Sequence, residues 1–186
     1  VLPGTGFDSV KMATDAKIVF NIGDNIDRVE LPETPGEAEI FFSGLYSTNA
    51  VVRVPDLDGE DLLITFPETG DQVLLVGAQL RSQLPLITFG DGVSWTGADL
   101  IARSIADQAG DEADVIFGSS AADTIEGGKG DDDIKGGAGA DTYLFTRGDG
   151  RDVIEDVSGT DVLKIFGYTP DDLEVVRPVA GRNELL

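Results

Sequence analysis

Aspartates recur with a period of nine residues in the second half of the chain, each within a glycine-rich stretch. Residues 127–135 read GGKGDDDIK, and residues 136–144 follow without a gap as GGAGADTYL. Both copies fit G-G-x-G-x-D-x-U-x, where U is a large apolar or aromatic residue. Glycine takes positive φ without steric cost, so the stretch can turn tightly and point several carbonyl oxygens inward beside the aspartate. Such oxygen ligands suit a hard cation such as calcium, which accepts six to eight of them at about 2.3–2.6 Å.

Weaker copies flank the two perfect ones in the same frame. Residues 109–117 and 118–126 keep the aspartate and the apolar position but have lost most of their glycines. Residues 147–155 restore x-G-x-G-x-D-x-U-x after a two-residue insertion, and residues 159–163 keep the glycine, the aspartate and the apolar positions. A residue other than glycine in left-handed geometry costs roughly 1–2 kcal/mol. We therefore expect the turns that lack glycine to bind calcium less well.

The repeat resembles the calcium-binding nonapeptide of the RTX (repeats-in-toxin, haemolysin-type) family. The resemblance implies an all-β fold with a parallel β-roll, in which each nonapeptide gives one turn and one strand and turns two repeats apart share each ion. One repeat buries too little apolar surface to be stable alone, so copies must stack. A lone Gly-Asp-rich run would be a flexible acidic loop, but two perfect copies with in-frame neighbours favour the roll. The predicted residues of a site for several calcium ions are Asp114, Gly118, Asp123, Gly127, Gly128, Lys129, Gly130, Asp132, Gly136, Gly137, Ala138, Gly139, Asp141, Gly148, Asp149, Gly150 and Asp152.

The first 96 residues form a segment of a different kind. Apolar and β-branched runs alternate there with turn residues at short intervals, which predicts an antiparallel β-rich segment. Residues 89–95, FGDGVSW, resemble the F-x-D-G-x-x-W stretch of the linker between RTX blocks, as in adenylate cyclase toxin and haemolysin-like secreted proteins. We expect Trp95 to be a packed aromatic side chain rather than a ligand contact. The predicted strands are 17–22, 27–31, 38–42, 50–54, 61–66, 72–76 and 85–89.

One helix is predicted at residues 97–108, directly before the first repeat. Thr96 and Asp99 have the spacing of a capping box. The ends of a solenoid need covering, so the helix is expected to cap the roll, although its apolar stripe could instead bind a partner. That stripe follows helical spacing and consists of Leu100, Ile101, Ser104 and Ile105.

The predicted organisation follows from these elements. Residues 3–11 have the same x-G-x-G-x-D-x-U-x form as residues 147–155, so the first segment is expected to start in the last turn of a preceding roll. The chain then resembles an internal block of a longer repetitive protein. The segments are the β-rich region 1–96, the capping helix 97–108, the roll 109–166, and the start of a truncated β flank, 167–186.

The composition narrows the classes of function. Thirteen basic and thirty-five acidic residues give a net charge of −22, which disfavours nucleic acid and anionic membranes because phosphate contacts need Lys and Arg. The same charge makes the metal-free chain self-repelling, and cations would relieve the repulsion. There is no Cys to form a disulfide and no His to act as the commonest catalytic base.

Together these features predict a calcium-binding structural module without catalytic activity. The resemblance implies a secreted bacterial protein, exported by type I secretion and folded by extracellular calcium, with neighbouring RTX blocks of the same protein as partners. Nucleic-acid binding and membrane insertion are not expected. Two alternatives stay open: adhesion to a glycan or host cell surface through the β-rich segment, and membership of a secreted protease, lipase or epimerase. The lack of His, Cys and a G-x-S-x-G motif argues against hydrolase chemistry in these residues.

Overall fold

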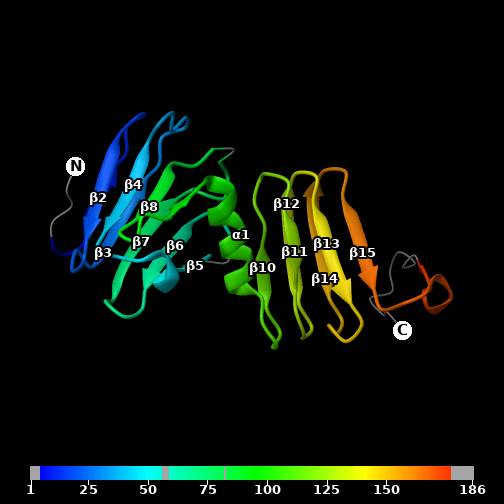
Figure 1. The fold of residues 1–186 in the computed structure, drawn as a ribbon. Helices are drawn as coiled ribbons and strands as arrows, with labels where there is room; N and C mark the ends of the chain where they lie inside the picture. The colour runs from blue at the N-terminus through cyan, green and yellow to red at the C-terminus, as the bar shows by residue number, and fades with distance from the viewer. Residues whose placement is uncertain (1–4, 56–58, 82, 177–186) are drawn as a thin grey trace.

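The computed structural model describes residues 5–55, 59–81 and 83–176, whose elements follow one another along an elongated molecule (Figure 1). The helix α1 (Gly97–Gln108) lies in the middle. The strands that precede it occupy one end of the molecule, and those that follow it occupy the other.

The strands after α1 form two parallel sheets, and successive strands alternate between them. Each strand pairs with the strand two places along the chain, so Ile116 lies beside Ile134, and Ile125 lies beside Tyr143. The predicted parallel β-roll is confirmed. One sheet contains β10 (Val115–Phe117), β12 (Asp133–Ala138) and β14 (Val153–Ser158). The other contains β11 (Thr124–Glu126), β13 (Thr142–Thr146) and β15 (Val162–Phe166).

The first segment is also built largely from parallel pairs, contrary to the antiparallel arrangement that we expected. Every predicted strand is present, within one residue at either end. The alternation of apolar residues decides which face of a strand is buried but not the direction of its neighbour, so the sequence pattern could not reveal the parallel pairing. The two parallel sets are β1 (Asp8–Lys11), β3 (Ile26–Glu30) and β7 (Asp71–Val76), and β2 (Lys17–Asn21), β4 (Glu39–Ser43) and β8 (Leu86–Phe89).

Antiparallel pairing in the described residues is confined to the later part of this segment. β6 (Leu62–Phe66) pairs with β7 and with β5 (Val51–Arg53), and β9 (Ser94–Trp95) pairs with β8. These hairpins therefore add to two sheets that are otherwise organised as in the roll.

Buried aromatic side chains form the core between the two sheets of the first segment. The ring centroid of Phe42 lies 5.7 Å from that of Phe20, 5.0 Å from that of Phe66 and 5.5 Å from that of Phe89. Trp95 packs edge-on against Phe89 at 4.4 Å, so it is a packed aromatic, as predicted. Aromatic pairs of this kind add about 0.5–1.5 kcal/mol each beyond the burial of their surface. The first segment therefore has a conventional apolar core.

The helix α1 joins the first segment to the roll. It begins with the predicted capping box, in which the Thr96 hydroxyl accepts the N–H of Asp99 at 3.2 Å and the Asp99 carboxylate accepts the N–H of Thr96 at 2.8 Å. The helix contacts β5 and β9 on one side and β10 and β11 on the other (Figure 1). Its buried face is the predicted stripe, Leu100, Ile101, Ser104 and Ile105.

The last residue of α1 completes the free edge of strand β10. Oε1 of Gln108 accepts the N–H of Phe117 at 3.1 Å, and Nε2 of Gln108 donates to the carbonyl of Phe117 at 3.3 Å. A side-chain amide thus takes the place that a neighbouring strand would occupy, and the edge is protected from further pairing. One residue earlier, Asp107 accepts the N–H of Val52 in β5 at 2.9 Å. The helix is therefore fixed to both of its neighbours by hydrogen bonds.

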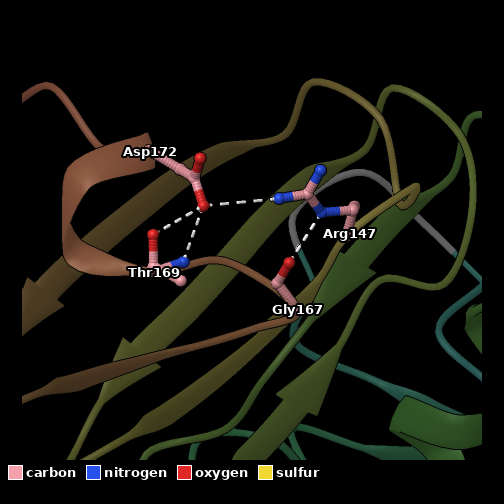
Figure 2. A network of polar contacts seen from close by, with 4 residues as sticks. All are labelled: Arg147, Gly167, Thr169 and Asp172. Atoms are coloured by element: carbon pink, nitrogen blue, oxygen red, sulfur yellow. Dashed lines mark hydrogen bonds and ion pairs between the residues drawn. The ribbon is translucent and has the colours of Figure 1, made fainter.

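An arginine ties the chain after β15 back to the roll (Figure 2). Nε of Arg147 donates to the carbonyl of Gly167 at 2.6 Å, and its Nη2 lies 3.5 Å from Oδ2 of Asp172. The same oxygen accepts the N–H and the hydroxyl of Thr169, both at 2.8 Å. The guanidinium also lies over the ring of Tyr168, 4.3 Å from its centroid.

The flank after the roll differs from the predicted strand. Its described part, residues 167–176, contains the short 3-10 helix η2 (Pro170–Asp172) and no strand, and the remainder, residues 177–186, lies outside the described residues. The last two strands of the roll, β14 and β15, are exposed along their length. Within the described part of the chain, no helix is long and apolar enough to cross a membrane.

Candidate metal centre

The nonapeptide turns stack in two columns, one on each side of the roll. The N–H of Lys129 donates to the carbonyl of Gly110 at 3.1 Å, and in the other column the N–H of Ala138 donates to the carbonyl of Ser119, also at 3.1 Å. Each turn therefore contacts the turn two repeats away, as the resemblance implied. The first column contains residues 110–114, 128–132 and 148–152, and the second contains 119–123, 137–141 and 158–161.

The glycines of these turns are required by both backbone angle and space. Gly128 and Gly130 have φ of 93° and 132°, which side chains rarely tolerate. A Cβ at Gly128 would collide with the carbonyl oxygen of Gly110, and one at Gly130 would collide with that of Glu112. The backbones of successive turns therefore lie close enough for their carbonyls to share a small volume.

The aspartates form a hydrogen-bonded ladder along each column. The N–H of Asp114 donates to Oδ1 of Asp132 at 2.9 Å, and the N–H of Asp132 donates to Oδ1 of Asp152 at 3.2 Å. On the other side, the N–H of Asp123 donates to Oδ1 of Asp141 at 2.8 Å, and the N–H of Asp141 donates to Oδ1 of Asp161 at 3.1 Å. The preceding turn of the column thus orients four of these carboxylates through Oδ1, which makes the second oxygen, Oδ2, the one to account for; the four are Asp132, Asp152, Asp141 and Asp161.

That second oxygen has no protein partner at three of these positions. Oδ2 of Asp114, Asp132 and Asp141 is buried without a hydrogen bond among the described residues. Burying a carboxylate oxygen in this way is costly unless a cation or donor meets it. Three turns that each carry such an oxygen fit a hard, oxygen-seeking cation such as calcium, to which these carboxylates and the nearby backbone carbonyls would be the ligands.

The local charge favours the same conclusion. Burial raises the pKa of Asp141 above its ordinary value, and the neighbouring carboxylates of Asp123, Asp156 and Asp161 raise it too, against the opposing effect of the Asp123 N–H. Burial likewise raises the pKa of Asp152. A divalent cation in the turns would stabilise the ionised carboxylates that the metal-free fold disfavours.

Asp123 differs from the other repeat aspartates because its second oxygen is occupied. Oδ2 of Asp123 accepts the N–H of Ser119 at 2.7 Å and the Ser119 hydroxyl at 2.9 Å. In this glycine-poor turn, serine donors take the place that a cation would fill. From the sequence, Asp114 and Asp123 were both expected to bind calcium less well. The unpartnered Oδ2 of Asp114 instead makes it similar to Asp132 and Asp141.

A cluster of three carboxylates lies where the second column continues. Oxygens of Asp141, Asp156 and Asp161 lie within 4.8 Å of one another, and Asp156 also accepts the hydroxyl of Tyr143 at 2.5 Å. Only Asp141 was in the predicted set. Asp161 keeps the repeat frame and could have been included, whereas Asp156 lies in strand β14, where the nonapeptide pattern assigns no ligand.

The remaining predicted residues lie in the same turns but contribute in different ways. The Lys129 side chain is exposed and lies 3.2 Å from Asp111 in the neighbouring turn of its column, and its backbone N–H bonds to Gly110 of the same turn. Asp149 accepts the N–H of Thr146, and its carbonyl accepts the N–H of Gly130 at 2.6 Å. Gly127, Gly136, Gly137 and Gly139 lie where a Cβ would meet an oxygen of the site or its neighbours, whereas Gly148 has open space around it. The close approaches at Gly118 and Gly150 are also to carbonyl oxygens.

Comparison with known proteins identifies the repeats. In a comparison with curated proteins, none matches the chain. The family model described as RTX calcium-binding nonapeptide repeat (4 copies) matches residues 108–143, which cover strands β10 to β12 and reach into β13. Residues 108–143 are thus RTX calcium-binding repeats, and this part of the chain is a calcium-binding module of the RTX type.

Proposed function

We propose that the chain is a non-catalytic module of a secreted bacterial protein, whose roll folds when it binds extracellular calcium and so couples export to folding. The observation that supports this most strongly is the set of buried, unpartnered carboxylate oxygens on Asp114, Asp132 and Asp141. Without a cation, these groups oppose the stacking of the turns. With a cation, the same groups become ligands that hold neighbouring turns together.

The distribution of the apolar core gives the second argument. The first segment and α1 bury a large set of apolar side chains, including four phenylalanines and Trp95. After α1, the buried apolar side chains up to residue 176 are Ile116, Phe117, Ile125, Ile134 and Tyr143. We therefore expect the metal-free roll, from about residue 109 onward, to be unfolded while the first segment remains folded.

Such a module would remain partly unfolded at the low calcium concentration of a bacterial cytosol and fold outside the cell. Neighbouring RTX blocks of the same protein are the partners that this role implies, with no nucleic acid and no membrane insertion by this segment. The strong negative charge supports both exclusions, because nucleic acid and anionic lipid attract basic surfaces.

Two spectroscopic probes test this proposal on the whole chain. The single tryptophan, Trp95, reports on the first segment, and far-UV circular dichroism reports on total β structure. In excess chelator, we expect buried-type Trp95 emission with a weak β signal, and calcium should then increase the β signal. The same dichroism spectrum in chelator and in calcium would contradict the proposal. The double variant Asp132→Asn, Asp141→Asn is the control, and it should need far more calcium for the same change.

A further inference from the structure

A further pair of stacked turns lies at the opposite end of the molecule from the matched repeats. Residues 22–27, IGDNID, form the turn between β2 and β3 together with the start of β3, and this turn stacks on residues 5–7, directly before β1. Asp27 is 1 % exposed, its Oδ1 accepts the N–H of Asp8 at 3.1 Å, and its Oδ2 is buried without a hydrogen bond among the described residues. Asp132 and Asp141 have the same contacts: Oδ1 is held by the preceding turn, and Oδ2 is left over.

The backbone of this turn also follows that of the repeats. Gly23 has φ of 89° and Asn25 has φ of 73°, at the places held by Gly128 and Gly130 in the repeat, whose φ values are 93° and 132°. Asparagine enters the left-handed region more readily than most residues. Its side chain also donates to the carbonyl of Gly23 at 3.0 Å, which holds the turn closed. Asn25 thus takes the role of the second turn glycine.

The hydrogen bond between the two turns also has a counterpart in the repeats. The N–H of Gly6 donates to the carbonyl of Asp24 at 3.1 Å, as the N–H of Gly130 donates to that of Asp149 at 2.6 Å. Asp8 and Asp27 are register partners, separated by 19 residues, and the repeat pairs are separated by 18 or 20. Turn angle, stacking bond and register therefore agree between the two places.

The other carboxylates near Asp27 already have partners. Oδ1 of Asp71 accepts the N–H groups of Gly23 at 3.0 Å and Asn25 at 2.9 Å, and Oδ2 of Asp24 accepts the N–H of Asn21 at 2.8 Å. They do not supply a donor to Asp27 but add negative charge around it. Burial raises the pKa of Asp27 to about 6, and the carboxylates of Asp8, Asp24 and Asp71 raise it too, while the N–H of Asp8 lowers it.

We propose that these two stacked turns bind one divalent cation of the calcium type, with Asp27 as its carboxylate ligand. Calcium fits better than magnesium because the site offers fixed protein oxygens on a bent backbone, whereas magnesium keeps several of its waters. The site lies outside the repeats matched by the family model and is independent of calcium-driven folding of the roll. Its ion would fasten β1 to β3 and so stabilise the first segment.

Counting bound ions in the whole chain tests the proposal. Asp27→Asn keeps the size of the side chain and an oxygen for the Asp8 N–H but removes the charge. Glu30→Gln, at the exposed end of the same strand β3, is the matched control for loss of one charge. By native mass spectrometry and calorimetric titration, Asp27→Asn should bind one calcium fewer than the wild type, and Glu30→Gln should bind the wild-type number. An unchanged number of ions in Asp27→Asn overturns the proposal, and would mean that Asp27 is simply protonated.

Two further measurements cover the other outcomes. Asp27→Asn could fail to fold, which exposed-type Trp95 emission would reveal. In that case, substoichiometric gadolinium is added to the wild type and NMR spectra are recorded. The gadolinium should broaden the amide signals of Gly6, Asp8 and Asp24, and excess calcium should restore them. Signals that stay sharp overturn the proposal. Equal retention of magnesium at this site overturns the assignment to calcium. Asp132→Asn removes an ion from the roll alone, so failure of the roll to bind calcium is distinguishable from failure of this site.

Discussion

Asp123 and Asp132 occupy the same place in their nonapeptides, yet their second oxygens have different surroundings. Ser119 satisfies that of Asp123, whereas that of Asp132 is buried and unpartnered. The aspartate alone therefore does not define a ligand. The second residue of the repeat, Ser119 beside Asp123, decides whether the carboxylate is free for a cation.

Neutral substitutions should separate the two kinds of aspartate. We expect Asp132→Asn and Asp141→Asn each to lower calcium affinity at least about tenfold, because a charged oxygen aimed at the ion is lost. Asp114→Asn should behave in the same way. Asp123→Asn should lower affinity less than about threefold, since its carboxylate already has donors in Ser119. Calorimetric titration of the four variants measures this, and equal losses at all four positions would show that the unpartnered oxygens are not the ligands.

Two glycines in one turn allow the cost of backbone strain to be distinguished from the cost of a steric clash. Gly148 and Gly150 both have positive φ, 106° and 123°, but a Cβ at Gly150 would collide with the carbonyl of Gly130, and one at Gly148 would meet nothing within 4 Å. Gly148→Ala should cost roughly 1–2 kcal/mol from backbone geometry. Gly150→Ala should cost more and raise the calcium midpoint of folding further. Similar midpoints for the two variants would mean that the turns stack less closely than described.

The raised aspartate pKa values set the direction of the pH dependence. The metal-free fold holds Asp141 and Asp152 with pKa values above the ordinary value of about 3.9, so it binds more protons than the unfolded chain. Stability without metal should therefore rise as pH falls toward that value, and be lost as pH rises through the folded pKa. Calcium needs the ionised form, so its affinity should fall on acidification. Titrations between about pH 7.5 and about pH 5 at constant ionic strength check both signs, and a midpoint that does not move would contradict them.

At the scale of elements, the sequence predicted the roll, the helix and all the strands named in advance, because each has a local signature. The nonapeptide fixes turn and strand together, and the capping box at Thr96 fixes the start of α1. The parallel pairing of the first segment has no such signature. Its turns lack the double glycine, and the turn at residues 22–27, which does follow the repeat geometry, has Asn25 where the pattern requires glycine.

The same limit applies to the candidate sites. The ladder aspartates were predicted because they keep the nine-residue frame. Asp156 and Ser119 were not. Asp156 acquires its role by packing against Tyr143 of another repeat, and Ser119 bonds to Asp123 within its own turn, at a place where the nonapeptide pattern assigns no side-chain role. Asp27 was not predicted because its turn lacks the spaced glycines of the nonapeptide, although its side chain is as buried as those of Asp132 and Asp141.

The end of α1 offers a test of how the helix supports the roll. Gln108→Ala removes both hydrogen bonds to Phe117 and leaves two backbone groups of β10 without these partners. We expect a loss of about 1–3 kcal/mol, seen as a higher calcium midpoint for the roll. The exposed Gln83→Ala is the control and should have no effect. A Gln108→Ala variant with the wild-type midpoint would show that the amide does not protect the strand edge.

For the whole molecule, the proposed folding on extracellular calcium would require several ions to bind together. Extracellular calcium modules have a Kd of about 10⁻⁴ to 10⁻³ M, so each site contributes only about 0.4–1.4 kcal/mol at roughly 1 mM calcium. Ordering one nonapeptide costs roughly 9–18 kcal/mol of backbone entropy before packing returns any of it. One ion therefore cannot fold the roll.

The folding transition should accordingly be steep in calcium. We expect a Hill coefficient above one for the dichroism signal of the roll, and no transition at sub-micromolar calcium. Calcium titration of the whole chain, followed at the same time by Trp95 emission, measures the roll and the first segment separately. A shallow curve for a single site, or complete folding at micromolar calcium, would rule out the proposed switch.

The ladder of aspartates has a direction, since each N–H donates to the carboxylate of the turn that follows it in its column. The first rung is held against α1 and the apolar core, whereas the last strands, β14 and β15, lie exposed. A stack with one anchored end behaves as a one-dimensional lattice in which growth needs no separate nucleus, because the anchor supplies the first layer. When calcium is withdrawn, such a lattice frays from the exposed strands far from α1, and amide protons near residue 160 should exchange with solvent before those near residue 116.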